Sequence, residues 1–274
     1  MTAAIPFTDL DLARRLERTE GRSNAAFVEA RARLFPDRGA SWQEIAGAYA
    51  LFDGAESPLT QTIGLGLFAE TNAADLAEIE AFFAERRAPV LHEISPLAPD
   101  SLWPLLRERG YFPVEFTSVL YRVLDDLPKL PATDSELKIR TIGPANARAW
   151  ARVAATGWLT EAPEFTQFLQ DLGQTSAQTR GMTHFLAEID GLPVATASLY
   201  QHAGVALLAG ASTVPAGRRQ GAQTALLAAR LHQAAAQGCT LAMMGARPGS
   251  QSQRNAERHG FRIAYTRTKW QLLR

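Results

Sequence analysis

The sequence predicts a mixed α/β (α+β) fold in which two similar lobes each form a mixed, mostly antiparallel sheet flanked by helices. Two observations lead to this prediction. Short apolar runs typical of strands alternate with longer helical segments along the chain, and the second half repeats the order of elements found in the first. A chain of 274 residues, 46% of them hydrophobic, is long enough for one large core or two modest ones.

The first half is expected to begin with helical material over residues 8–18 and 23–34. The segment AGAYALFDG that follows is interpreted as a hairpin arm. A helix then leads into a short apolar run at residues 90–94, which predicts a strand. A polar loop, a second short helix and a final extended segment after Gly110 complete this half.

The second half ends in the same way, at a constant separation of 150 residues. Gly110 and Gly260 each precede an aromatic residue, and each fits a left-handed glycine at a helix C-terminus whose aromatic neighbour folds back into the core. Ala88 and Gly238, which each follow a helix, have the same separation. One such ending is common, but two at a constant offset indicate a duplication.

The boundary between the halves is predicted in residues 125–137, where two prolines and several polar residues interrupt any periodicity. The predicted domains are residues 1–130 and residues 137–274.

The second half opens with a strand, LKIRTI, and a helix that begins near Pro144. Three strands joined by turns at residues 190–191 and 203–204 follow. One parallel pair is expected across the long helix that comes next. The remaining elements are expected to be a helix over residues 218–237, a strand over 240–245, a helix over 251–258 and one or two strands over 261–273.

Charge and cysteine content exclude some classes of function. Lysine plus arginine and aspartate plus glutamate both number 28, which argues against a nucleic acid or an anionic membrane as partner. Cys239 is the only cysteine and forms no internal disulfide, which favours a reducing compartment. No apolar stretch is typical of a signal peptide or a membrane span. We expect a cytoplasmic protein, whose oligomeric state the sequence does not predict.

The segment STVPAGRRQGAQTAL is the clearest candidate for a binding site. A strand is expected to end at Val214, and the turn after it leads into a helix whose first amide groups lack internal partners. Gly221 lets a ligand approach the backbone closely. Arg218 and Arg219 have a geometry suited to phosphate oxygens. Together these features predict a cradle for a pyrophosphate.

The alternative interpretation is an ordinary turn before a helix, with two solvated arginines. Arginine near a helix N-terminus is unfavourable to the helix dipole, so two of them there favour an anionic partner.

This segment resembles the acetyl-CoA motif of the Gcn5-related N-acetyltransferase (GNAT) family. Arg218, Gly221 and Gln223 occupy its R/Q-x-x-G-x-G/A positions, with Gln223 in place of a small residue. Downstream, NAERHGF resembles the second family motif, in which a helix ends in Gly-Phe. The resemblance extends over residues 137–274. It implies a tandem arrangement whose N-terminal lobe is degenerate.

The resemblance implies an N-acetyltransferase that takes acetyl-CoA as cosubstrate and acts on the amine of a small molecule or peptide. The strand edge is then expected to pair with the pantetheine amides, and the turn to bind the pyrophosphate. For Asn255, a helix-surface side chain is the alternative, and no metal is predicted. The predicted cosubstrate-binding residues are Thr213, Val214, Arg218, Arg219, Gln220, Gly221, Ala222, Gln223, Thr224 and Asn255.

The corresponding segment of the first half, GLGLFAETNAADLAEI, has no arginine or glycine after its strand. Glu70 and Asp75 flank the start of its helix, where they would repel a pyrophosphate. Asn72 or Thr71 is expected to cap the helix. This lobe is therefore interpreted as a support for the active one.

Candidate catalytic residues are few. The glutamate that many family members carry on the fourth strand is missing, and Ala256 stands where they have a tyrosine. Tyr200 and His202 are the predicted substitutes, with half-buried strand residues as the alternative. Glu188, Ser212 and Tyr265 are weaker candidates, and structural roles are expected for His92 and His259.

Acceptor specificity is expected in the segment TGWLTEAPEFTQFLQDLGQ. Trp158, Glu161, Glu164 and Phe165 would form an aromatic and acidic mouth for a cationic amine, or the two aromatic residues are core residues. Two other functions stay open. One is a non-catalytic acyl-CoA-binding or sensor protein, and the other is an interaction module with no cosubstrate.

Overall fold

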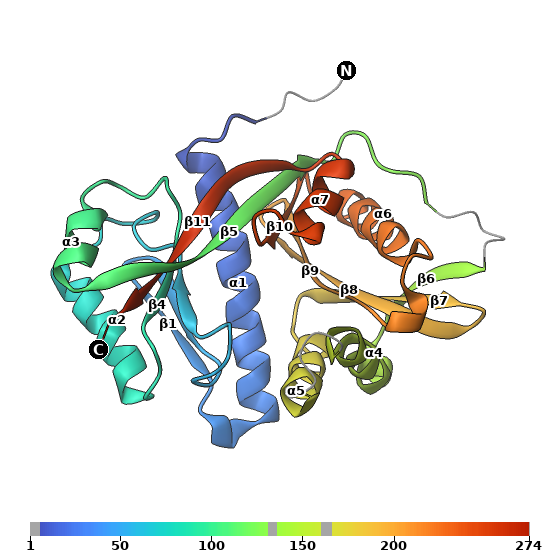
Figure 1. The fold of residues 1–274 in the computed structure, drawn as a ribbon, viewed down its shortest axis with the longest axis horizontal. Coiled ribbons are helices and arrows are strands. Elements are labelled where there is room, and N and C mark those ends of the chain that lie inside the picture. The colour runs from blue at the N-terminus through green and yellow to red at the C-terminus, as the bar shows by residue number, and fades with distance from the viewer. Residues whose placement is uncertain (1–5, 131–135, 160–165, 274) are drawn as a thin grey trace. The chain divides into compact units, whose positions relative to one another are not determined.

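The computed structural model describes residues 6–130, 136–159 and 166–273 (Figure 1). It is a mixed α/β protein, as predicted, with mixed sheet structure flanked by helices. Within these residues the chain forms two compact units, which we describe separately. Unit 1 comprises residues 123–242, and unit 2 comprises the chain up to residue 122 together with residues 243–273.

Unit 2 contains six strands in the order β1-β2-β3-β4-β11-β5. Neighbouring strands are antiparallel except β3 and β4, which are parallel. Its elements are α1 (Leu10–Leu34), β1 (Ser41–Ile45), β2 (Ala48–Phe52), β3 (Gln61–Ile63), α2 (Ala73–Glu85), β4 (Leu91–Ile94), α3 (Leu102–Glu108), β5 (Tyr111–Val123), α7 (Gln251–Arg258) and β11 (Arg262–Leu272).

Strand β2 is buried on both faces and organises the core of unit 2. Ala48, Ala50 and Phe52 belong to the cluster that contains the apolar residues of α2 and α3. Tyr49 and Leu51 alternate with them and pack with residues of α1. Because side chains alternate across a strand, this short segment joins two hydrophobic layers. The predicted hairpin arm is confirmed as the β1–β2 hairpin.

One continuous helix, α1, replaces the two helices expected over residues 8–18 and 23–34. Asp9 caps it by accepting a hydrogen bond from the amide of Leu12 at 2.9 Å. Gly21 does not interrupt the helix. A Cβ atom at this position would lie 2.4 Å from Cδ2 of Tyr49, so the glycine makes room for a buried aromatic ring. The mid-helix glycine is a packing feature, and the prediction of a break was wrong.

The repeat of element order at an offset near 150 residues is confirmed. Strand β4 begins at Leu91, and its counterpart β10 (Leu241–Ala246) begins at Leu241. Strand β11 lies between β4 and β5 and pairs with both. In the antiparallel β5–β11 ladder Thr117 lies opposite Arg267, its own equivalent in the repeat, so the two repeated strands pair with each other.

This insertion of β11 explains why the compact units differ from the predicted domains. Residues 243–274, predicted as the end of the second domain, belong to the same unit as the first half of the chain. The division into residues 1–130 and 137–274 stays a prediction about the repeat.

Unit 1 contains an antiparallel sheet in the order β6-β7-β8-β9. Helices α4 and α5 lie on one face and α6 on the other (Figure 1). The turns at residues 190–191 and 203–204 have positive φ at both positions, as the predicted hairpins require. The elements are β6 (Leu137–Ile142), α4 (Ala147–Leu159), α5 (Thr166–Ala177), β7 (Met182–Ile189), β8 (Leu192–His202), β9 (Val205–Thr213) and α6 (Ala222–Ala236), and β10 leads from this unit into unit 2.

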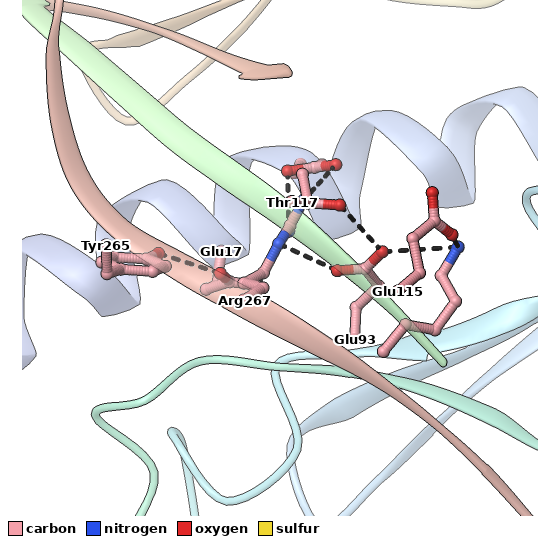
Figure 2. Close-up of polar contacts among 8 residues, drawn as sticks. Glu17, Glu93, Glu115, Thr117, Tyr265 and Arg267 are labelled. Carbon is pink, nitrogen blue, oxygen red and sulfur yellow. Dashed lines mark hydrogen bonds and ion pairs between the residues drawn. The ribbon is translucent and has the colours of Figure 1, made fainter. Parts of the chain in front are cut away.

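A buried cluster of charged residues ties β11 to α1 and β4 in unit 2 (Figure 2). The guanidinium of Arg267 contacts three carboxylates, those of Glu17 at 3.2 Å, Glu20 at 2.9 Å and Glu93 at 3.2 Å. The hydroxyl of Tyr265 donates to Glu17 at 2.8 Å. Tyr265, a weaker catalytic candidate, is thus buried and engaged in a structural contact. Lys269 extends the cluster toward solvent through ion pairs with Glu93 and Glu115.

Replacing Arg267 with Met is expected to destabilise the protein severely. The three carboxylates would lose their common partner in a buried site, which typically costs about 3–5 kcal/mol of unfolding free energy. Chemical denaturation measures the loss, and Arg254→Met on the exposed surface of α7 is the matched control, expected within about 0.5 kcal/mol of the parent. A loss below about 1 kcal/mol for Arg267→Met would contradict this account of the cluster.

Glu17 is expected to make stability depend on pH. Burial raises the pKa of its carboxyl from 4.5 to about 7, although Arg267 opposes the shift. Between these two values the folded state keeps a proton that the unfolded state releases, so the contribution of Glu17 to stability falls as pH rises. The unfolding free energy of the parent minus that of Glu17→Gln should therefore decrease between about pH 4.5 and 7, by on the order of 2–3 kcal/mol. A difference that stays constant over this range would refute the shifted pKa.

Candidate functional site

The turn between β9 and α6 is fixed to the neighbouring strand β8. The amide of Val214 donates to the carbonyl of Val194 at 2.9 Å, and a short 3₁₀ turn over Pro215–Gly217 follows. Gly217 is buried against the same residue, because a Cβ atom there would lie 2.6 Å from Cβ of Val194. The start of this turn, which we call the corner (residues 214–217), is therefore held in a defined position on unit 1.

Beyond this corner the backbone is shaped for close approach of an anion. Arg219 has φ +61° and Gly221 has φ +79°, both left-handed, and the residues over 218–221 are exposed. Left-handed residues are a component of the backbone nests that bind anions. A left-handed conformation at an arginine is uncommon, which marks this turn as specialised.

The start of α6 is open. The first amide to find an intrahelical acceptor is that of Ala225, which donates to Gly221 at 3.0 Å. The amides of Ala222, Gln223 and Thr224 precede it and have no such acceptor. Within the part of the chain that the structure describes, no side chain caps this helix. Three N–H groups at the positive end of the helix dipole thus lack an acceptor within the helix, which is the arrangement found at anion-binding helix starts.

Helix α2, the counterpart of α6 in the repeat, is closed by its own side chains. The Asn72 side chain accepts from the amides of Ala74 at 2.8 Å and Asp75 at 3.1 Å. The Asp75 carboxylate accepts from the amide of Asn72 at 2.9 Å, which completes a capping box. The prediction that Asn72 caps this helix is confirmed.

The polar side chains of the turn make different contacts. Gln223 donates to the carbonyl of Ser212 at 3.0 Å and to the Thr213 hydroxyl at 2.7 Å, so its amide braces the end of β9. Arg218 donates to the carbonyl of Gly157 on α4 at 3.3 Å. Arg219 has no side-chain hydrogen bond or ion pair with any described residue. Arg219 is therefore the guanidinium best placed to meet an anion.

Strand β9 carries a bulge that sequence analysis missed. Its pairing with β8 breaks between Thr196 and Ser198, and Gly210 in this stretch has φ +61°. Beneath the bulge lies the buried guanidinium of Arg230, which donates to the carbonyls of Ser198 at 3.4 Å and Ala209 at 3.5 Å. Burial lowers the pKa of Arg230 to about 10. A sequence signal existed, because Arg230 interrupts the apolar stripe of α6 at helical spacing.

His184 is a second buried polar residue near this bulge. Its Nδ1 lies 2.9 Å from the Ser198 hydroxyl, and its ring packs 4.8 Å from that of Trp150. Burial lowers its pKa to about 4, so the imidazole is neutral at ordinary pH.

The two predicted catalytic residues lie along β8, toward the hairpin that joins it to β9. Tyr200 lies opposite Leu207 and His202 opposite Val205, whereas Ala195 is the partner of Thr213 next to the corner. At about 3.3 Å per residue, Tyr200 lies about 17 Å and His202 about 23 Å along β8 from Ala195. The structure thus separates both from the turn between β9 and α6, and their catalytic role stays a prediction.

Asn255 lies on α7 in unit 2, whereas the turn belongs to unit 1. Its side-chain oxygen accepts from Gln251 at 2.7 Å on the exposed helix surface, in line with the alternative interpretation. Its role toward a cosubstrate stays a prediction. His259 contacts the carbonyl of Asn255 at the end of this helix, at 2.7 Å, which confirms its structural role.

The remaining candidates are structural. His92 is fully buried against Tyr111, and burial lowers its pKa to about 3. Glu188 pairs with Arg140 at 2.9 Å, and the buried Ser212 hydroxyl donates to a carbonyl of α4. Trp158 is 45% exposed, which contradicts its assignment to the core. Glu161, Glu164 and Phe165 lie outside the described residues.

Comparison with known proteins gives a family match for the part of the chain that contains the turn. Residues 121–251 match the family model of the acetyltransferase (GNAT) domain. This stretch is a GNAT domain. It covers just under half of the chain and includes β9, the turn and α6. The family resemblance of the second half is therefore confirmed, and a general acetyl-transfer function is supported.

Several solved structures share the fold of this chain. A GCN5-related N-acetyltransferase from Kribbella flavida aligns with a TM-score of 0.63 and 21% identity, covering 90% of this chain and 95% of that one. One from Sphaerobacter thermophilus aligns with a TM-score of 0.55 and 17% identity, over 92% and 91%. A tandem GNAT protein from the clavulanic acid biosynthesis pathway aligns with a TM-score of 0.58 and 13% identity, over 82% and 77%. No curated protein matches the chain.

None of the helices in the described ranges is both long and apolar enough to cross a membrane. No group of three or more His, Cys, Asp or Glu residues is arranged there to hold a metal ion.

Gly157 is expected to be essential because it lets α4 pack closely against the end of β9. A Cβ atom at Gly157 would lie 1.9 Å from Oγ of Ser212 and 2.8 Å from the amide nitrogen of Thr213. Gly157→Ala should therefore lower the unfolding free energy by about 1–3 kcal/mol, although alanine usually favours a helix over glycine. Thr156→Ala, next to it on the exposed face, is the control for denaturation. A stabilised Gly157→Ala variant would show that the contact is absent.

Proposed function

We propose that the protein is an acetyl-CoA-dependent N-acetyltransferase in tandem arrangement, with one cosubstrate site, at the start of α6. The acceptor is the amine of a small molecule or peptide. The observation that carries the proposal is the open start of α6, where three amides without intrahelical acceptors adjoin Arg219, an exposed arginine that pairs with no described residue.

The charge of the cosubstrate fits the start of α6. The diphosphate of acetyl-CoA is anionic, and the amides of residues 222–224, the helix dipole and Arg219 are all complementary to it. Gly221 has no side chain to obstruct its approach, since a Cβ atom there would meet only Leu137, at 4.0 Å. The capped start of α2 offers neither the free amides nor the arginine, which supports a single site.

The pantetheine arm is proposed to run along the C-terminal end of β9, which finishes at Thr213. Gln223 already donates to the Ser212 carbonyl, so this acceptor is shared with the protein's own side chain. The arm would then pair with the backbone groups of β9 that remain.

Acetyl transfer to an amine needs little from side chains. It requires a neutral amine, a polarised thioester carbonyl and a proton for the departing thiolate. Strand β9 has no carboxylate, and Ala256 occupies the position of the family's usual tyrosine. We therefore propose that positioning by the backbone does most of the work, with proton transfer through water or the substrate.

Replacing both Arg218 and Arg219 with Ala is expected to weaken binding of acetyl-CoA at least about tenfold, because charge-assisted hydrogen bonds to the diphosphate are lost. Isothermal titration calorimetry measures the dissociation constant. Arg254→Ala, which removes one exposed arginine from α7, should leave it unchanged. Equal affinity of the double variant and the parent would count against the site, and absence of binding by the parent would end the proposal.

A non-catalytic acyl-CoA-binding or sensor protein is the second candidate function, and the missing glutamate and tyrosine favour it. The two functions differ in thiol release. The enzyme should release CoA steadily with at least one member of a broad amine panel, whereas a sensor should bind acetyl-CoA and release none.

A further inference from the structure

A groove between α4 and α5 forms a separate candidate site on unit 1. The two helices lie side by side (Figure 1) and approach closely at Gly173, where a Cβ atom would lie 3.0 Å from Cα of Ala151. A groove of about 390 Å³ adjoins this contact. Its lining residues are Arg148, Ala151, Arg152, Gln170 and Gln174.

Among the described residues, the lining is basic and contains no acidic residue. Arg148 and Arg152 lie one turn apart on α4, so two like charges face the same groove, an arrangement that destabilises a helix when no counter-charge is present. Neither guanidinium has an ion pair or hydrogen bond within the described ranges. Other arginines of the chain do find carboxylates, as Arg140 does with Glu188 and Arg109 with Glu80.

The facing helix supplies neutral donors. Gln170 and Gln174 lie one turn apart on α5 and are half-buried, so their amide groups are partly withdrawn from water. Among the described residues neither side chain has a hydrogen-bond partner. Four polar side chains converge on one hollow without a partner among the described residues, which indicates a ligand that supplies acceptors.

We propose that this groove binds an oxyanion group of a small molecule, a phosphate in preference to a carboxylate. Guanidinium groups form paired, charge-assisted hydrogen bonds with the oxygens of such groups, and the two glutamine amides donate from the other wall. Two positive charges favour the more highly charged phosphate. The groove shares no residue with the start of α6, so the inference does not depend on acetyl-CoA binding there.

The test uses inorganic phosphate on the full chain, followed by nuclear magnetic resonance of backbone amides and arginine side chains. Phosphate should shift the signals of Arg148 and Arg152 saturably, with a dissociation constant in the millimolar range. Sodium chloride at matched ionic strength should not. Arg148→Gln combined with Arg152→Gln should weaken this binding at least about tenfold. Arg254→Gln, an exposed arginine on α7, is the matched control and should leave it unchanged.

Two further arms, with acetate and with acetyl-CoA, decide between outcomes. Acetate that binds as tightly as phosphate would support the groove and assign it to carboxylates. Saturating acetyl-CoA should leave the phosphate shifts in place, and loss of those shifts would overturn the claim of a separate site. The proposal is also overturned if phosphate up to about 50 mM shifts no signal in α4 or α5, or if the double variant binds it like the parent.

Discussion

The start of α6 is the constraint on which the functional account depends. A helix leaves its first amide groups without partners, and a protein satisfies them with a side chain, with water or with a ligand. In this chain Gly221 provides no capping side chain, and the exposed turn before it has a left-handed backbone at Arg219. The arginines are unfavourable to the dipole unless an anion joins them. The backbone conformation, the glycine and the charges therefore favour the same ligand.

The repeat within the chain provides an internal comparison. Helices α2 and α6 occupy equivalent places in the order of elements, yet Asn72 and Asp75 close one of them while the other stays open. The difference lies in a few side chains at each helix start and leaves the framework of strands and helices unchanged. The proposed presence of a cosubstrate site at α6 and its absence at α2 would thus require no change of fold.

Local features could be predicted from the sequence, and non-local ones could not. The turn, α6 and the Asn72 cap depend on neighbouring residues, so their patterns are visible in short segments. The insertion of β11 between β4 and β5 depends on pairing across more than a hundred residues, and the Glu17–Arg267 contact joins residues 250 apart. Gly21 misled the prediction of α1, because its role is to accommodate Tyr49, which lies distant in sequence. Arg230 and the bulge at Gly210 likewise act only in the folded sheet.

The most direct test of the central claim is the response of individual backbone amides to acetyl-CoA. Nuclear magnetic resonance of the ¹⁵N-labelled protein follows the amides of Ala222, Gln223 and Thr224 beside those of Ala74 and Asp75, which are already capped in α2. The account predicts large, saturable shifts at the start of α6 and none at the start of α2. Unchanged signals over residues 222–224 at saturating acetyl-CoA would contradict it.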